Sequence, residues 1–143
     1  MKHHIDTSII LEDPHTDNGR FCTRYLNKVK FTGGGVFSLP VLGELMMALL
    51  ESKDYNKRMD FQEFLVHLIK FHEVQYYAPK RATSILDKIR MLDSRLDPID
   101  TEILACAIED GAQCLVTLDR KLICNKVLEN EFNIAISHPK DLV

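Results

Sequence analysis

The stretch "HHIDTSIIL", residues 3–11, has the composition of a buried strand but carries a carboxylate inside it. Ile5, Ile9 and Leu11 are large apolar residues of the kind that fill buried strands. Asp6 lies among them, and burying a carboxylate is costly unless it is protonated, paired or bound to a metal ion. The sequence therefore predicts a strand over about residues 3–11 with an acid that needs a partner.

Predicted strands and helices alternate along the rest of the chain. Further strands are expected over residues 36–39, 74–78, 112–118 and 133–137. Helices are expected over residues 19–29, 40–51, 56–73, 80–92, 96–111 and 119–132, with Thr16 or Asp17 capping the first and Pro79 opening the fourth. This alternation favours an α/β fold with a parallel sheet covered on both faces. In such sheets, ligands bind beyond the carboxyl ends of the strands.

The composition is that of an ordinary globular chain. Its 143 residues fit one domain, residues 1–143, and its net charge of -3 provides no general basic field for nucleic acid. The longest apolar run, "LPVLGELMMALL", is too short for a membrane span and contains Glu44. The cysteines form no CxxC pair and lie in apolar contexts, which indicates reduced core thiols: Cys22, Cys106, Cys114 and Cys124. We therefore expect a soluble, cytoplasmic protein.

Acidic residues stand in apolar surroundings in four separate segments. Besides Asp6, Glu44 lies in a helix that is apolar nearly all round, and Asp119 follows the strand sequence "CLVTL". Asp100 lies in the first turn of the helix that contains "DTEILACA". Simple structural roles exist for two of them, because Asp100 would favour a helix dipole and Asp119 could cap the next helix. Asp6 and Glu44 have no such explanation, which favours convergence on one site.

Converging carboxylates repel each other, and a divalent cation relieves that repulsion. An all-oxygen ligand set suits Mg²⁺ or Mn²⁺ and not zinc. Such an ion can activate water and neutralise charge on a phosphoryl group, so hydrolysis of a phosphodiester is the natural reaction class.

Four stretches, "HIDTSIIL", "SLPVLGEL", "DTEILACA" and "TLD", together resemble the PIN-domain ribonucleases, which include the VapC-type toxins. The resemblance runs from residue 3 to about residue 136. It implies an α/β/α sandwich with a mostly parallel central sheet of about five strands. It also implies a hydrolase, a metal-dependent endoribonuclease that uses Mg²⁺ or Mn²⁺. The implied partners are an RNA substrate, an antitoxin protein and a second copy of the chain in a homodimer.

Carried over to this sequence, the resemblance implies that four acids are both catalytic residues and metal ligands: Asp6, Glu44, Asp100 and Asp119. Ser8 corresponds to the small hydroxyl residue near the first acid, and Thr117 to the threonine of the last motif. Asp97 and Glu102 flank Asp100 and could assist, although solvation at the surface explains both.

The helix expected over residues 56–73 carries an apolar stripe, made of Phe61, Phe64, Leu65, Leu68 and Ile69. The simplest interpretation is core packing. In the PIN family, the corresponding hairpin often lies at a dimer interface or in an antitoxin groove, so an exposed part would be a partner surface. His67 and His72 lie on the same segment, but they do not share a helix face and form no zinc motif. The basic residues at helix ends are expected to be solvated, and the sequence singles out none for RNA binding.

Two other functions remain open. A phosphoacceptor receiver domain is also a parallel α/β fold that binds Mg²⁺, but it needs a pair of acids directly after the first strand. Glu12 and Asp13 come too late for that pair, Lys140 matches only in part, and Glu44 would have no role. A catalytically silent PIN-like scaffold is the other alternative, and the presence of all four acids disfavours it.

Overall fold

A computed structural model describes residues 1–70 and 74–143, apart from the side chains of residues 68 and 69, and its centre is one five-stranded sheet. The strands are β1 (His3–Ile5), β2 (Gly35–Ser38), β3 (Val74–Tyr77), β4 (Cys114–Val116) and β5 (Ala135–Ser137). All neighbouring strands are parallel, in the order β3-β2-β1-β4-β5. The first strand of the chain is thus the middle strand of the sheet.

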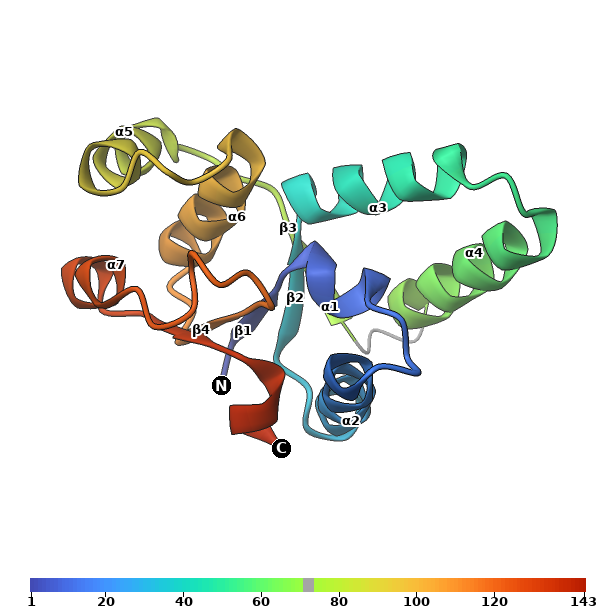
Figure 1. Ribbon diagram of the computed structural model, residues 1–143. Coiled ribbons are helices and arrows are strands. Elements are labelled where there is room, and N and C mark those ends of the chain that lie inside the picture. The colour runs from blue at the N-terminus through green and yellow to red at the C-terminus, as the bar shows by residue number, and fades with distance from the viewer. Residues whose placement is uncertain (71–73) are drawn as a thin grey trace.

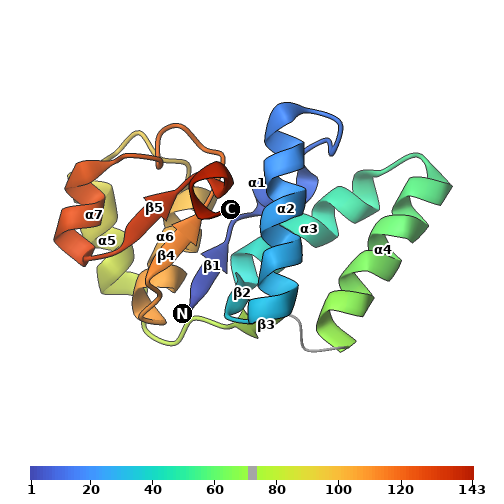
Figure 2. The same cartoon turned by 90° about the horizontal axis from the view of Figure 1, so that it is seen from below.

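Helices cover both faces of the sheet. They are α1 (Thr7–Leu11), α2 (Asp17–Thr32), α3 (Leu39–Glu51), α4 (Tyr55–Lys70), α5 (Thr83–Leu92), α6 (Pro98–Glu109) and α7 (Lys126–Phe132), with a 3-10 turn over Pro139–Leu142. In Figure 1 and Figure 2, α5, α6 and α7 lie on one side of the sheet and α1 to α4 on the other. The predicted α/β/α sandwich with a parallel sheet is confirmed. None of the described helices is long and apolar enough to cross a membrane.

The predicted strand over residues 3–11 is wrong in its second half. β1 ends at Ile5, Asp6 is the N-cap residue of α1, and residues 7–11 are helical. Short apolar runs do not distinguish a buried strand from a buried helix, whereas the polar residues Asp6, Thr7 and Ser8 favour a helix start. Asp6 therefore lies beyond the end of a strand, and not inside one.

Two predicted helices are shorter than expected. The helix expected from Pro79 begins at Thr83, because the backbone N–H groups of Lys80 and Arg81 donate to the Glu109 carboxylate at 2.6 and 2.8 Å. The helix expected over 119–132 is reduced to α7 (Lys126–Phe132). A turn precedes it, and Cys124 at the end of that turn has a positive φ of 60°, which interrupts a helix.

The remaining predicted helices are confirmed within one turn of their ends. Thr16 caps α2 as predicted, with its hydroxyl accepting from the Gly19 N–H at 2.9 Å. The predicted extension of α4 through residues 71–73, which includes His72, lies outside the described residues. Phe61, Phe64 and Leu65 of the predicted stripe pack on or against the core.

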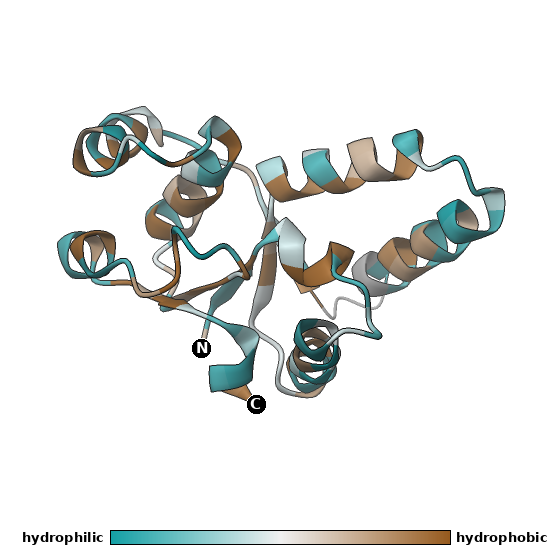
Figure 3. Cartoon of the chain, viewed as in Figure 1, coloured by the Kyte–Doolittle hydropathy of each residue, from teal (hydrophilic) through white to brown (hydrophobic). Residues whose placement is uncertain are grey.

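The core lies between the sheet and the inner helices. β4 and much of α6 are hydrophobic in Figure 3, and Leu104 and Leu115 are fully buried. Cys22, Cys106 and Cys114 are buried thiols, as predicted, but Cys124 is exposed because it lies on the turn before α7.

Replacing Leu104 by Ala should lower the free energy of unfolding by about 2–5 kcal/mol, because a fully buried side chain leaves a cavity in α6. Leu50→Ala on the exposed face of α3 is the matched control and should change stability little. Urea unfolding followed by circular dichroism measures both. Equal losses in the two variants would contradict the assignment of the core.

Candidate functional site

The register of the sheet brings two predicted site residues to one edge. Ile5 of β1 pairs with Val116 of β4, and each strand ends at that residue. The Asp6 N–H continues the pairing by donating to the Val116 carbonyl oxygen at 2.9 Å. Asp6 and the segment that leads to Asp119 therefore leave the sheet side by side at its carboxyl edge.

A cleft of about 360 Å³ lies at this edge. Its lining is Asp6, Thr7, Ser8, Leu11, Glu12, Glu44, Asp100, Leu118 and Asp119. All four predicted acids thus line one cleft, although they come from the N-cap of α1, from α3, from α6 and from the segment after β4. The lining contains no basic side chain.

Two hydroxyl groups fix the Asp6 carboxylate. Ser8 donates to Asp6 Oδ2 at 2.6 Å and Thr117 donates to the same oxygen at 2.8 Å. The two hydroxyls in turn accept from the backbone N–H groups of Leu118 and Asp119, at 3.1 and 3.0 Å. Asp6 is only 4% exposed, so these bonds provide its polar contacts on the protein side. Ser8 therefore lies next to the first acid, as the resemblance implied, and Thr117 of the last motif binds the same carboxylate.

Glu44 is held by a residue that the sequence analysis did not single out. The Thr7 hydroxyl donates to Glu44 Oε1 at 2.6 Å, and Thr7 is itself buried. The sequence carries one signal for this role, because Thr7 directly follows Asp6. A strand over residues 3–11 obscures it, because Thr7 is in fact the first residue of α1.

Asp100 and Asp119 form a carboxyl pair. Burial, a hydrogen bond with Asp119 and the negative charges of Asp119, Asp6 and Asp97 raise the pKa of Asp100 to about 7. The raised pKa favours the protonated form of Asp100, whose carboxyl can then donate to Asp119. Asp119 does not cap a long helix; its Oδ1 accepts from the Lys121 N–H at 2.9 Å and so shapes the turn that follows.

The donor chemistry of the cleft is that of a hard cation, since its acidic side chains offer only oxygen. Within residues 1–70 and 74–143, however, no three His, Cys, Asp or Glu side chains already stand close enough to hold a metal ion together. Among the described residues, the acids therefore line one cleft without forming a preassembled group of metal ligands.

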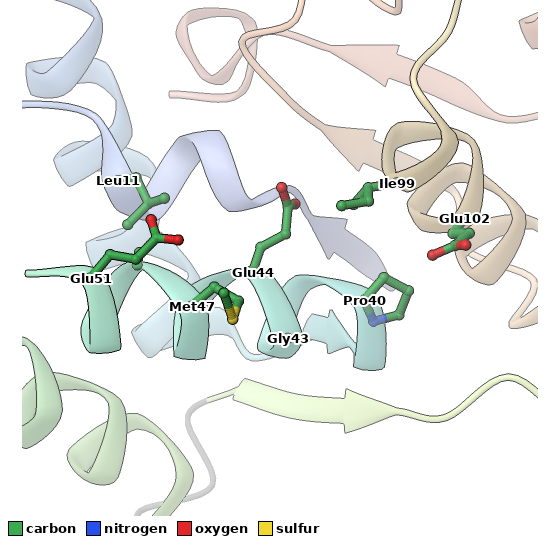
Figure 4. Close-up of a pocket in the computed structure, with 9 residues that line it drawn as sticks. Leu11, Pro40, Gly43, Glu44, Met47, Glu51, Ile99 and Glu102 are labelled. Carbon is green, nitrogen blue, oxygen red and sulfur yellow. The ribbon is translucent and has the colours of Figure 1, made fainter.

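A second hollow of about 470 Å³ runs along α3 and shares Leu11 and Glu44 with the cleft. In Figure 4, Glu44 and Ile99 point toward one another across it, and Glu51 lies beside Leu11. We call this hollow the α3 groove; it is lined by Leu11, Pro40, Gly43, Glu44, Met47, Ala48, Glu51, Ile99 and Glu102. Glu102, a candidate auxiliary ligand, thus lines the groove and not the cleft, and Asp97 is exposed.

The sheet order and the helices on both faces give the chain a PIN-like α/β/α fold. The chain is similar to a chain of VapBC2 from Rickettsia felis bound to a DNA fragment from its promoter, with 18% identity, a TM-score of 0.70, and coverage of 96% of this chain and 98% of that one. It is also similar to FitAcB from Neisseria gonorrhoeae, with 14% identity, a TM-score of 0.67, and coverage of 96% and 98%. It is similar as well to VapBC-1 from nontypeable Haemophilus influenzae, with 16% identity, a TM-score of 0.66, and coverage of 98% of this chain and 99% of that one.

At these identities the likenesses establish a shared fold. No protein-family model and no curated protein matches the sequence.

The carboxyl pair should give the metal-free protein a distinctive pH dependence. The folded state keeps a proton on Asp100 between its ordinary pKa of 3.8 and about 7, whereas the unfolded chain has released it. Stability should therefore fall as the pH rises through this window. Asp100→Asn removes that proton, so the variant should lose less stability over the window and should be more stable than the wild type above pH 7.

Thermal unfolding in EDTA across the window measures this difference. Asp60→Asn makes the same chemical change on the exposed surface of α4 and should behave like the wild type. If the stability of the wild type and of Asp100→Asn changed in parallel with pH, the folded protein would not retain a proton on Asp100.

Proposed function

We propose that this protein is a metal-dependent endoribonuclease of the toxin type. The observation that carries the proposal is the convergence of Asp6, Glu44, Asp100 and Asp119 on one cleft at the carboxyl edge of the sheet. The fold supports it, because the similar solved structures are VapBC and FitAcB assemblies. The absence of basic side chains from the cleft lining also fits a site whose phosphate ligand needs a cation.

Asp6, Asp100 and Asp119 would hold Mg²⁺ or Mn²⁺, directly or through water, with Glu44 beside them. Their all-oxygen chemistry fits these ions. When bound, such an ion lowers the pKa of a coordinated water and neutralises charge that develops on the phosphate. Asp100 would give up its proton on binding, since metal ligands must be deprotonated.

The hydroxyl side chains of the cleft bind one oxygen of each of two acids. Ser8 and Thr117 both occupy Oδ2 of Asp6 and so leave Oδ1 for a ligand. Thr7 occupies Oε1 of Glu44, which leaves Oε2 to orient the attacking water and receive its proton. The result is in-line attack on the scissile phosphate by a water that the protein has already positioned.

A protein antitoxin is the partner that we propose for the α3 groove. VapBC and FitAcB are the assemblies to which the chain is similar. The groove combines apolar lining with the acids Glu44, Glu51 and Glu102, and the neighbouring Met46 and Leu50 are exposed. An amphipathic segment with basic side chains matches this surface. Formation of a homodimer stays a prediction, which analytical ultracentrifugation would measure.

Different observations bear on the two alternative functions, the receiver domain and the silent scaffold. A receiver domain has the strand order 2-1-3-4-5, whereas this sheet has the order 3-2-1-4-5, so the topology disfavours that function. A silent scaffold would have no need for four acids in one cleft, and titration with Mn²⁺ distinguishes it from a metal-dependent enzyme.

Asp6→Asn should abolish RNA cleavage while leaving the fold intact, because it removes a negative charge but keeps the shape and the hydroxyl contacts of the side chain. The measurement is cleavage of total RNA with Mn²⁺, with EDTA as the metal-free control. Calorimetric titration with Mn²⁺ should show binding to the wild type and weaker binding to the variant. Cleavage at the wild-type rate by Asp6→Asn would refute the site, and the absence of both cleavage and Mn²⁺ binding in the wild type would favour the scaffold.

Thr7→Val should reduce cleavage by about 10- to 100-fold, as is typical when a residue that orients a ligand is lost. Valine keeps the size of the side chain but cannot donate to Glu44 Oε1. Thr7→Ser restores the hydroxyl and should recover most of the rate. If both variants were equally impaired, Thr7 would act through packing and not through its hydrogen bond.

A further inference from the structure

The cleft lining has no basic side chain, so side-chain contacts to the phosphates that flank the scissile one would have to come from the surrounding rim. Three segments at the rim can be compared by charge. On the α1 side, Glu12 lines the cleft and Asp13 follows it. On the α3 side, the groove contributes Glu51 and Glu102 and no basic residue. Both of these flanks would repel a phosphate backbone.

The third flank has the opposite charge. Arg120 and Lys121 directly follow Asp119, and both side chains are exposed. In the part of the chain that the structure describes, no ion pair involves either of them. The nearby Arg95 differs, because its guanidinium already donates to both carboxylate oxygens of Asp93, at 3.0 and 2.8 Å.

The turn that carries these two cations is fixed relative to the cleft. The backbone N–H groups of Leu122 and Ile123 both donate to the Asp119 carbonyl oxygen, at 3.1 and 3.0 Å. The Leu122 side chain is 1% exposed and anchors the turn in the core. The backbone N–H of Lys121 donates to the Asp119 carboxylate. The side-chain Nζ of Lys121 lies 3.4 Å from the Arg95 carbonyl oxygen. Arg120 and Lys121 are therefore held beside a cleft acid on a short, closed turn.

We propose that Arg120 and Lys121 form the phosphate-binding rim of the cleft and direct the RNA strand over the turn between β4 and α7. This inference rests on the proposed ribonuclease function and adds the side on which the substrate lies. The cations bind backbone phosphates next to the scissile one, so they position the strand without reading its sequence. The strand avoids the α3 groove, where Glu51 and Glu102 would repel it.

The test compares the affinity of variants for a short fluorescein-labelled single-stranded RNA. All of them carry Asp6→Asn, so that the RNA remains intact, and anisotropy is measured over a range of salt concentrations with Mn²⁺ present. Arg120→Ala/Lys121→Ala should weaken binding several-fold and reduce the slope of log affinity against log salt by about 1.4, the value for two phosphate contacts to a single strand. Arg120→Lys/Lys121→Arg preserves both charges and should keep the affinity and the slope.

Arg24→Ala/Lys57→Ala removes the same two charge types from exposed positions on α2 and α4, and is the matched control. It should leave the salt slope unchanged. Calorimetry with Mn²⁺ should give the same metal affinity with and without Arg120→Ala/Lys121→Ala, which separates the rim from the metal site.

The outcomes distinguish the rim from the proposed function. If the wild type cleaves RNA but Arg120→Ala/Lys121→Ala binds RNA with an unchanged slope, the rim assignment is overturned and the ribonuclease proposal stands. An equal loss in the Arg24→Ala/Lys57→Ala control would also overturn it, because it would show a general effect of net charge. If the wild type cleaves no RNA and its Asp6→Asn variant binds none, both proposals fail.

Discussion

The parallel pairing of β1 with β4 is the constraint on which the rest of the site depends. Because Ile5 and Val116 are opposite each other and both strands stop there, the chain must turn away from the sheet twice at the same edge. The polar residues that follow each strand then have a common location. Asp6 is joined to the β4 side directly, through its N–H to Val116 and its carboxylate to Thr117.

Such convergence creates electrostatic repulsion between the acids. Burial and the neighbouring negative charges raise the pKa of Asp100, which favours its neutral form, and hydroxyl groups donate to Asp6 and Glu44. Under the proposed function, a divalent cation would displace the proton and the same hydroxyls would keep the carboxylates in place. Thr7, Ser8 and Thr117 thus serve both states, since each binds one oxygen of an acid and leaves the other free.

The sequence predicted which acids meet because two of them, Asp6 and Glu44, broke a local pattern and the resemblance added Asp100 and Asp119. Asp6 and Glu44 interrupt apolar segments, and their burial or cleft position bears this out. It did not predict the end of β1, because Ile9 and Leu11 suit a buried strand as well as a helix. The sequence also did not predict contacts between distant segments. One example is the Glu109 carboxylate, which accepts from the backbone N–H groups of Lys80 and Arg81, so that α5 begins only at Thr83. Nothing local in the sequence marks Glu109 as a cap for a segment so far away.

The charges around the cleft separate two kinds of partner. A phosphate backbone is attracted by basic side chains, whereas a basic, apolar protein segment is attracted by acidic ones. The two ligands would therefore bind different surfaces. The α3 groove presents Glu51 and Glu102 among apolar side chains, while the opposite turn presents Arg120 and Lys121. The two surfaces meet at the acids of the cleft, with Glu44 lining both the groove and the cleft. A protein in the groove could therefore inhibit cleavage by engaging Glu44, without occupying the rim where the RNA backbone would bind.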